Sequence, residues 1–199
     1  MTTLEALTSR ISSCTLCADR FAATQTAHAP RPVVYPSTTA RILIAGQAPG
    51  ARVHASGVPF DDPSGDRLRD WLGVDRETFY DRTRIAIVPM AFCFPGYDAK
   101  GSDLPPPKLC AETWRAVLLA EMPQTDLTLL VGQYAQGWHM GKARKKTLTE
   151  TVRAWRSYGP DILPLPHPSW RNTAWLKRNP WFEAEILPWL RQRVRDLIA

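Results

Sequence analysis

The chain has 199 residues, of which 44% are hydrophobic and 22% are charged. This composition excludes a disordered or fibrous protein, and the length fits one domain, residues 1–199, with a sizeable core. Lysine and arginine outnumber aspartate and glutamate by 25 to 19, a formal net charge of +6. Such a charge is only a weak indication of a polyanionic partner, because many basic proteins bind no nucleic acid.

The apolar runs, such as residues 42–46 and 127–132, are too short to cross a bilayer. The start of the chain carries Glu5 and Arg10 inside an amphipathic pattern and lacks the apolar segment of a secretory leader. We therefore expect a cytoplasmic protein with no membrane partner.

In chain order, the first expected element is a helix over residues 3–13, because Leu4, Leu7 and Ile11 fall on one helical face. Residues 22–39 are polar and contain prolines, which predicts a surface loop. Residues 41–45 then end in a short apolar run that is typical of a buried parallel strand.

A loop follows that strand and ends at residues 63–65, where we expect Ser64 to cap a helix. Residues 85–90 predict a second buried strand, and residues 109–121 predict another helix. The inward residues expected on the two helices are Leu68, Trp71, Leu72, Trp114, Val117 and Leu118.

In the last third of the chain, the pattern predicts two more strands and two more helices. They are strands over residues 127–131 and 162–165, a helix over 133–140, and a closing helix from Asn179-Pro180 to Leu197 with a kink at Pro188. Alternating strands and helices favour an α/β fold: three layers, α/β/α, around a mostly parallel four-stranded sheet. Because ligands bind at the carboxyl ends of such strands, the site is expected in the loops after Ala45 and Leu165.

The four cysteines form two pairs. Cys14 and Cys17 are a C-x2-C pair, and sixteen residues separate Cys93 from Cys110. Disulfides are disfavoured in a reducing compartment, so the pairs suit a four-thiolate site for zinc or an iron–sulfur cluster. The alternatives are buried unliganded thiols or a C-x2-C redox pair, although no βαβ pattern precedes Cys14.

Basic residues gather between positions 142 and 178, where only Glu150 and Asp161 oppose them. Tryptophans lie in and just after the same region. Cations neutralise phosphates and aromatic faces stack on bases, so this region is a candidate nucleic-acid surface, with a solvated cationic face over core tryptophans as the alternative. The basic residues are Lys142, Arg144, Lys145, Lys146, Arg153, Arg156, Arg171, Lys177 and Arg178, and the tryptophans are Trp155, Trp170, Trp175 and Trp181.

The loop after the first strand reads GQAPG, residues 46–50. It lacks the later glycines of a dinucleotide-binding loop and the Gly-Lys-Ser/Thr of a Walker A loop. Its glycines and proline would instead expose backbone N–H groups to a flat polar ligand. Residues 57–62 (GVPFDD) add an aromatic ring beside two carboxylates, and residues 167–169 (HPS) end the fourth strand.

In this order, the segments resemble the uracil-DNA glycosylase superfamily over nearly the whole chain, and most closely its family-4, iron–sulfur branch. Residues 46–50 match the G-E-A-P-G type loop, residues 57–60 match G-x-P-F, and residues 167–169 match H-P-S/A. The cysteines match both spacings of the branch. The resemblance implies a [4Fe–4S] cluster, with zinc as the alternative, held by Cys14, Cys17, Cys93 and Cys110.

The resemblance also implies an activity: a monomeric, monofunctional glycosylase that removes uracil from DNA during base excision repair in the cytoplasm, at the bacterial nucleoid. Gln47, Ala48 and His167 would hydrogen-bond the departing base, and Phe60 would stack on the flipped base. Phe92 is a further expected base contact. The residues expected to contact DNA are Ser169, Trp170, Arg171 and Asn172, with Trp170 as the wedge.

Three positions depart from the family pattern. Gln47 replaces a usual Glu, and Ala48 stands where the water-activating Asp lies in the best-known members. Asp61 or Asp62 are therefore the candidate catalytic carboxylates. Pro89 replaces the Asn that reads uracil, so hypoxanthine or xanthine as the target, or a catalytically silent iron–sulfur DNA-binding protein, stay open.

The structural alternatives for the same residues also stay open. His167 between two prolines could be a structural turn residue, and Asp61 or Asp62 could cap the following helix. Phe60 could be ordinary core, and Trp170 could be buried rather than inserted into DNA.

Overall fold

A computed structural model describes residues 3–199. Its centre is a four-stranded sheet with the order β2-β1-β3-β4, in which every neighbouring pair is parallel. The strands are β1 (Ile42–Ala45), β2 (Ile85–Ile87), β3 (Leu127–Val131) and β4 (Ile162–Leu165). The predicted strands are confirmed, except that β2 ends at Ile87, because Pro89 has no N–H to continue the ladder.

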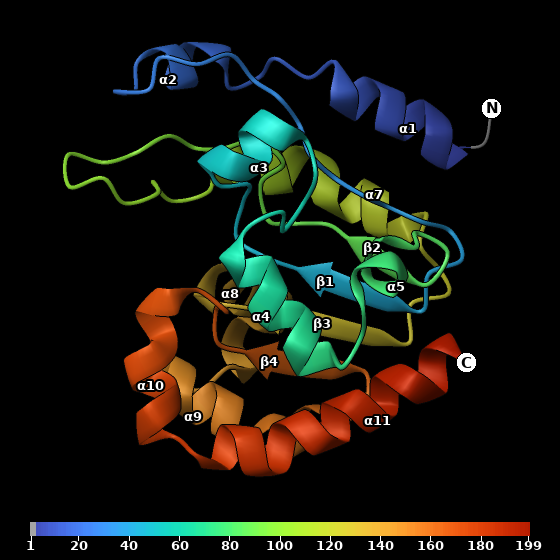
Figure 1. Cartoon of the computed structure of the whole chain (residues 1–199). Helices are drawn as coiled ribbons and strands as arrows, with labels where there is room; N and C mark the ends of the chain where they lie inside the picture. Colours follow the sequence, from blue (N-terminus) through green and yellow to red (C-terminus); the bar gives the residue numbers. More distant parts are fainter. Residues whose placement is uncertain (1–2) are drawn as a thin grey trace.

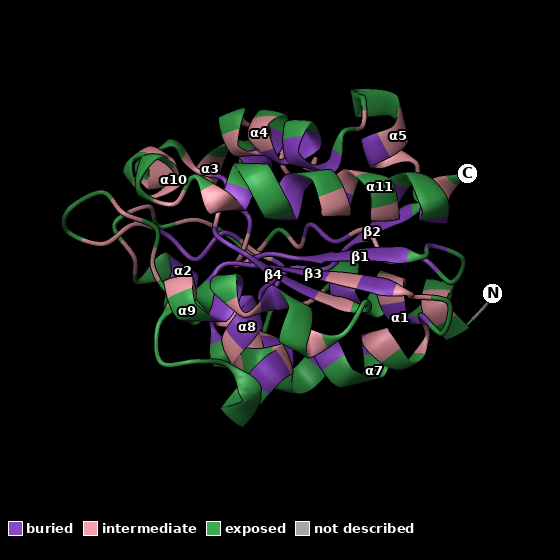
Figure 2. Ribbon diagram, turned by 90° about the horizontal axis from the view of Figure 1, so that it is seen from below, coloured by how far each residue is buried: buried purple, intermediate pink, exposed green. Residues whose placement is uncertain are grey.

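Helices cover both faces of the sheet, which confirms the predicted three-layer α/β/α architecture (Figures 1 and 2). One layer contains α4 (Pro63–Leu72), α5 (Arg76–Tyr80) and α11 (Leu187–Ile198). The other contains α1 (Thr3–Ser12), α7 (Ala116–Ala120) and α8 (Gln133–Met140).

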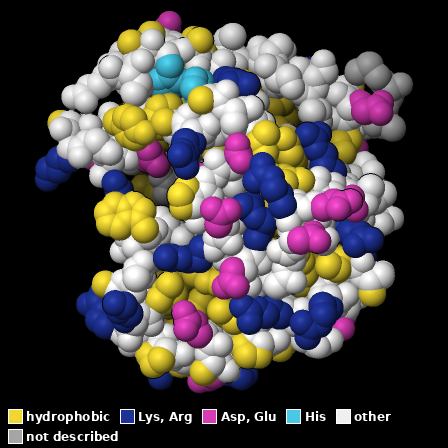
Figure 3. Space-filling model, viewed as in Figure 1, with side chains coloured by type: hydrophobic (Ala, Val, Ile, Leu, Met, Phe, Trp, Pro, Cys, Tyr) yellow, Lys and Arg dark blue, Asp and Glu magenta, His cyan; other side chains and the backbone are white. Residues whose placement is uncertain are grey.

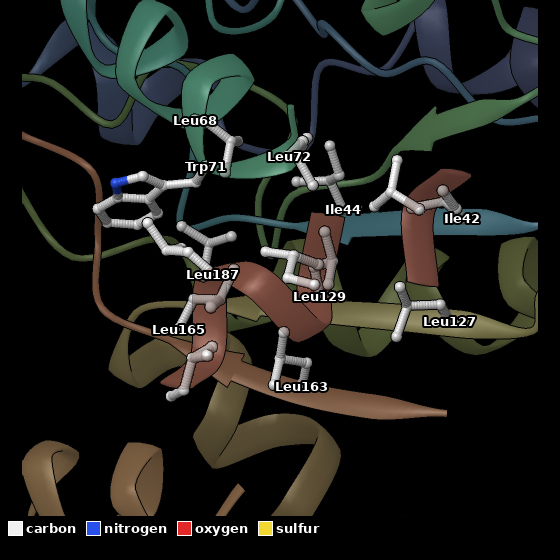
Figure 4. Close-up of a cluster of buried hydrophobic side chains, with 14 of the residues drawn as sticks. Ile42, Ile44, Leu68, Trp71, Leu72, Leu127, Leu129, Leu163, Leu165 and Leu187 are labelled. Carbon is white, nitrogen blue, oxygen red and sulfur yellow. The ribbon is translucent and has the colours of Figure 1, made fainter. Parts of the chain in front are cut away.

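Successive residues of β1 supply two different cores, since side chains alternate across a strand. Ile42 and Ile44 pack with Leu68 and Leu72 of α4 and with α11 (Figure 4). Leu43 packs on the opposite face with α1 and the helix that carries Leu118.

The remaining helices are short. They are α2 (Ala18–Ala22), α3 (Ala51–Ser56), α6 (Lys108–Cys110), α9 (Leu148–Arg153) and α10 (Thr173–Arg178), with π-helical turns η1 (Ala111–Arg115) and η5 (Phe182–Ile186) and 3-10 turns η2 (Gly141–Ala143), η3 (Trp155–Tyr158) and η4 (Trp170–Asn172). No helix in the described part of the chain is long and apolar enough to cross a membrane.

Several local predictions are wrong. The cap of α4 is Asp62, whose carboxylate accepts the Gly65 N–H, and Ser64 lies inside the helix. Val117 is half exposed, because the π-helical turn before it rotates the following residues away from the predicted face. The predicted closing helix, in contrast, is one continuous helical run over residues 181–198, in which the π turn η5 leads directly into α11 just before Pro188.

Candidate functional site

A cavity of about 700 Å³ opens beside the carboxyl ends of β1 and β4. The loops after these two strands both contribute to its wall, as the sheet topology predicts. The lining also includes residues from the first turn of α3, from the start of α4 and from the hairpin between β2 and α6. The lining residues from the predicted set are Gln47, Ala48, Phe60, Asp62, His167, Ser169, Trp170, Arg171 and Asn172.

His167 is held in one orientation and one tautomer. The Ser169 backbone N–H donates to Nδ1 at 3.2 Å, and the Asn172 side chain donates to the His167 carbonyl at 2.8 Å. Burial lowers the pKa of His167, although Asp62 acts in the opposite direction. The ring is therefore neutral at pH 7, and because Nδ1 accepts a hydrogen bond, the proton lies on Nε2, which is free to donate.

Phe60 lies against the loop that follows β1. A Cβ atom at Gly46 would come within 3.4 Å of Phe60 Cζ, and one at Gly65 would overlap the Phe60 carbonyl oxygen. Phe60 itself has a positive φ of 55°, a conformation that costs a non-glycine residue about 1–3 kcal/mol. The packing around it thus holds a partly exposed aromatic ring at the cavity wall.

Asp61 and Asp62 are neighbours with different surroundings. Asp62 lines the cavity, near enough to His167 to affect the His167 pKa. Asp61 does not line it: its carboxylate accepts a hydrogen bond from Arg76 at 2.9 Å, and this bond lowers the pKa of Asp61. The structure therefore separates the two candidates that the sequence left equal, and it also makes Asp62 the helix cap.

The loop after His167 projects from the protein. Trp170 is 75% exposed, so the alternative of a buried side chain is wrong. Two arginines tie the loop down: Arg67 of α4 donates to the Ser169 carbonyl at 2.9 Å, and Arg171 contacts the Ser102 hydroxyl at 3.4 Å. Figure 3 shows Lys and Arg side chains beside exposed hydrophobic groups on the face of the molecule seen in Figure 1.

Phe92 is not brought to this cavity. It is 2% exposed, packs in the core with Trp114 and Leu118, and lines a second, smaller cavity beside the cysteines. The prediction of Phe92 as a base contact is not supported by this position. Pro89, in contrast, does line the large cavity.

The residues that the sequence analysis did not predict in the cavity lining include Tyr97 and Asp103. They pair with each other across a short hairpin that reaches over from the end of β2. Partial burial raises the pKa of Asp103, whereas Arg171 lowers it. Gly96 and Gly101, both with positive φ, are a local indication of the hairpin's turns, but nothing local indicates that it reaches the cavity.

All four cysteines line the second cavity, together with apolar residues such as Pro32 and Trp114. Burial raises the pKa of Cys93 to about 12 and of Cys110 to about 11. Two backbone groups already donate to these sulfurs: Phe92 N–H to Cys110 Sγ at 3.4 Å, and Arg31, whose bond lowers the pKa of Cys93. Within residues 3–199, no group of three or more His, Cys, Asp or Glu side chains is arranged to hold a single metal ion.

A parallel α/β/α sheet with a cavity at the carboxyl ends of its strands is the usual arrangement of an α/β protein that binds a ligand at that edge. The sequence matches the Uracil DNA glycosylase superfamily over residues 32–191, and the chain belongs to that superfamily.

One solved structure with a similar chain is the solution structure of a "putative Uracil DNA glycosylase" from Methanosarcina acetivorans. The identity is 16%, the match covers 80% of this chain and 94% of that chain, and the TM-score is 0.48.

Proposed function

We propose that this protein is a monofunctional DNA glycosylase that hydrolyses the N-glycosidic bond of uracil in DNA and leaves an abasic site for base excision repair. Membership of the superfamily supports a glycosylase that acts on DNA. The observation that carries the proposal is His167, a neutral ring whose Nε2–H is free to donate in the cavity formed by the family's loops. We further propose a monomer that acts at the nucleoid.

The reaction makes the departing base anionic and the sugar cationic. His167 and the backbone N–H groups near Gln47 and Ala48 would donate hydrogen bonds to the base oxygen as charge develops. Phe60 would stack on the flipped base. Asp62 would stabilise the cationic sugar and hold the attacking water. No lysine is among the described residues that line the cavity, which fits hydrolysis without a Schiff base.

The two adjacent aspartates provide a matched test of the carboxylate. We expect Asp62→Asn to lower turnover by about 10²-fold or more, because an amide carries no charge to stabilise the sugar cation. Asparagine also caps helices, so the stability of α4 is retained. We expect Asp61→Asn to change turnover less than about threefold, since Asp61 contacts Arg76 outside the cavity. The single-turnover rates of the two variants test this assignment. An equal loss of turnover in both variants would show that Asp62 is not the catalytic carboxylate.

The identity of the base is best tested by cleavage. Labelled single- and double-stranded oligonucleotides with one uracil, hypoxanthine or xanthine would be incubated with excess protein and then treated with alkali. We expect strand breaks at uracil. Because Pro89 lies in the cavity wall and offers no side-chain hydrogen bond, another deaminated base is the second candidate. Strand breaks only at hypoxanthine or xanthine would make that base the substrate in place of uracil. No breaks at any base would favour a DNA-binding protein without activity.

A basic loop between α8 and α9 supports DNA as the partner. Lys142, Arg144, Lys145 and Lys146 are all exposed, and none takes part in an ion pair with another described residue. Changing all four to Gln should make the plot of log affinity against log salt shallower, by about 0.7–0.9 for each DNA phosphate that the variant no longer neutralises.

The matched control removes four exposed arginines elsewhere: Arg41, Arg82, Arg84 and Arg195, all to Gln. Arg41 and Arg84 precede β1 and β2, at the edge of the sheet opposite the cavity, and α11 ends on that side (Figure 1). The net charge changes equally, so an equal change of slope in both variants would show a general charge effect rather than direct binding of phosphates by the basic loop.

We also propose that the four cysteines hold a [4Fe–4S] cluster. The thiols around one apolar cavity and the N–H donors to two sulfurs fit such a group. Zinc would draw four sulfurs to about 2.3 Å from one ion, whereas a cluster spreads its thiolates over separate irons. When bound, the group would cross-link the end of α1 to the segments around Cys93 and Cys110.

A further inference from the structure

Arg115 is a buried cation without an acidic partner. It is fully buried at the end of η1, and burial lowers its pKa only to about 10, so the guanidinium is charged at neutral pH. Its Nη1 donates to the carbonyls of Val88 and Pro89 at 2.8 and 2.9 Å. Its Nε has no hydrogen-bond partner, and no described carboxylate forms an ion pair with it.

The neighbours of Arg115 do not supply the missing negative charge. Nη2 contacts His139 Nε2 at 2.6 Å, but burial together with Arg115 lowers the pKa of His139 to about 3, so this ring is neutral. The Trp138 ring lies 5.0 Å from the guanidinium carbon and offers only a weak cation–π interaction. A buried charge that lacks its counter-ion strongly destabilises a fold.

Arg115 and Cys110 belong to one continuous helical run, α6 followed by η1. Both contact the segment after β2: Cys110 Sγ accepts from the Phe92 N–H at 3.4 Å, and Arg115 donates to the Val88 and Pro89 carbonyls. A loaded cysteine site would place an anionic thiolate at Cys110, on the same helical run as Arg115, whereas no described carboxylate forms an ion pair with Arg115.

We propose that Arg115 is the counter-cation of the anionic centre that the four cysteine thiolates form with their metal, and that it joins this centre to the cavity wall through the Pro89 carbonyl. The inference rests on the cofactor part of the proposed function. When the metal binds, each thiol releases its proton to solvent. The four thiolates carry more negative charge than a zinc ion or an oxidised cluster carries positive charge, so the loaded site is a net anion. Arg115 acts through other groups and is a positioning residue.

The test compares full-length protein with its cysteine site loaded and the same protein stripped by a chelator. Loading raises the unfolding temperature, and we expect this rise to shrink clearly in Arg115→Met. We also expect the variant to bind its metal about 10–100-fold more weakly in competition with a chelator, as is usual when a residue that supports metal ligands is removed. If the metal is an iron–sulfur cluster, its reduction potential should become more negative, because a nearby cation favours the added electron.

Arg69→Met is the matched control. Arg69 is also buried, lies over an aromatic ring, and has its own carboxylate partner in Asp66. Its loss should lower the unfolding temperature of loaded and stripped protein equally. Arg115→Lys keeps the charge and should retain the metal within a few-fold of the wild type, and it remains informative if the methionine variant does not fold.

The role of Arg115 would be overturned if metal loading raised the unfolding temperature equally in wild type and Arg115→Met. It would also be overturned if Arg115→Lys lost its metal to the chelator as readily as Arg115→Met. A wild-type protein that takes up neither zinc nor iron with sulfide would overturn it together with the cofactor. Neither result depends on cleavage of DNA, so a failure of the glycosylase proposal is seen separately in the oligonucleotide assay.

Discussion

Replacing His167 with alanine is expected to lower the rate of base release by about 10²–10³-fold, because one hydrogen-bond donor to the developing anion is removed. DNA affinity should stay within a few-fold of the wild type, since the exposed loop from Ser169 to Asn172 remains. Single-turnover cleavage gives the rate, and fluorescence anisotropy of a labelled oligonucleotide gives the affinity. His28→Gln is the control, because His28 binds Thr26 and Phe94 outside the cavity.

The pH profile tests the same assignment. Burial lowers the pKa of His167 below the usual 6.5, so the donating neutral ring persists as pH falls through 6.5, and activity should fall only at lower pH. The same shift affects stability. As pH falls, His167 is protonated in the unfolded chain before it is protonated in the folded protein, so the stabilisation from the neutral ring is present above pH 6.5 and is lost as pH falls below it. Near-wild-type turnover in His167→Ala would show that the assigned role is wrong.

Replacing Cys110 with alanine is expected to abolish the cofactor and to lower the unfolding temperature by about 10 °C, as a loss of about 3–4 kcal/mol does in a chain of this size. The reason is that metal binding contributes directly to folding when the ligands come from separate segments. Cys110 follows the hairpin, whereas Cys14 and Cys17 follow α1. Iron and sulfide content, absorbance near 400 nm and thermal unfolding measure the effect.

Leu16→Ala is the control for this cavity. Leu16 lines it and is 55% exposed, so its truncation changes the lining without removing a ligand. If the wild-type protein is colourless and holds stoichiometric zinc, the cofactor is zinc rather than an iron–sulfur cluster, and the four-thiolate site itself is retained. Wild-type protein that binds no metal would leave four free, partly buried thiols, and then Cys110→Ala should have little effect.

The sheet and the position of the site could be predicted from the sequence because both depend on local patterns. A parallel strand covered on both faces is mostly apolar: residues 42–45 are apolar throughout, and residues 127–131 are apolar except for Thr128. The loops that follow parallel strands meet at one edge, which places residues 46–50 and 167–169 together. The motifs of the superfamily lie in these loops, so the family was also identifiable from order and spacing.

What the sequence left undecided depends on contacts between residues far apart in the chain. Asp61 and Asp62 are adjacent and chemically identical, and only the positions of Arg76 and the cavity distinguish them. Phe92 was expected to contact the base, but it packs in the core beside Trp114 instead.

Arg115 shows the same limit most clearly. The sequence predicts a regular helix over its segment, and a charged side chain is normally exposed on such a helix. The structure instead buries Arg115 in the π-helical turn, where it donates to the Val88 and Pro89 carbonyls. The sequence by itself therefore determined the sheet, the loops and the family, through local periodicity and spacing. Only the tertiary structure decided which side chains share a cavity and which charges lack a partner, because burial and long-range contacts arise only when the chain is folded.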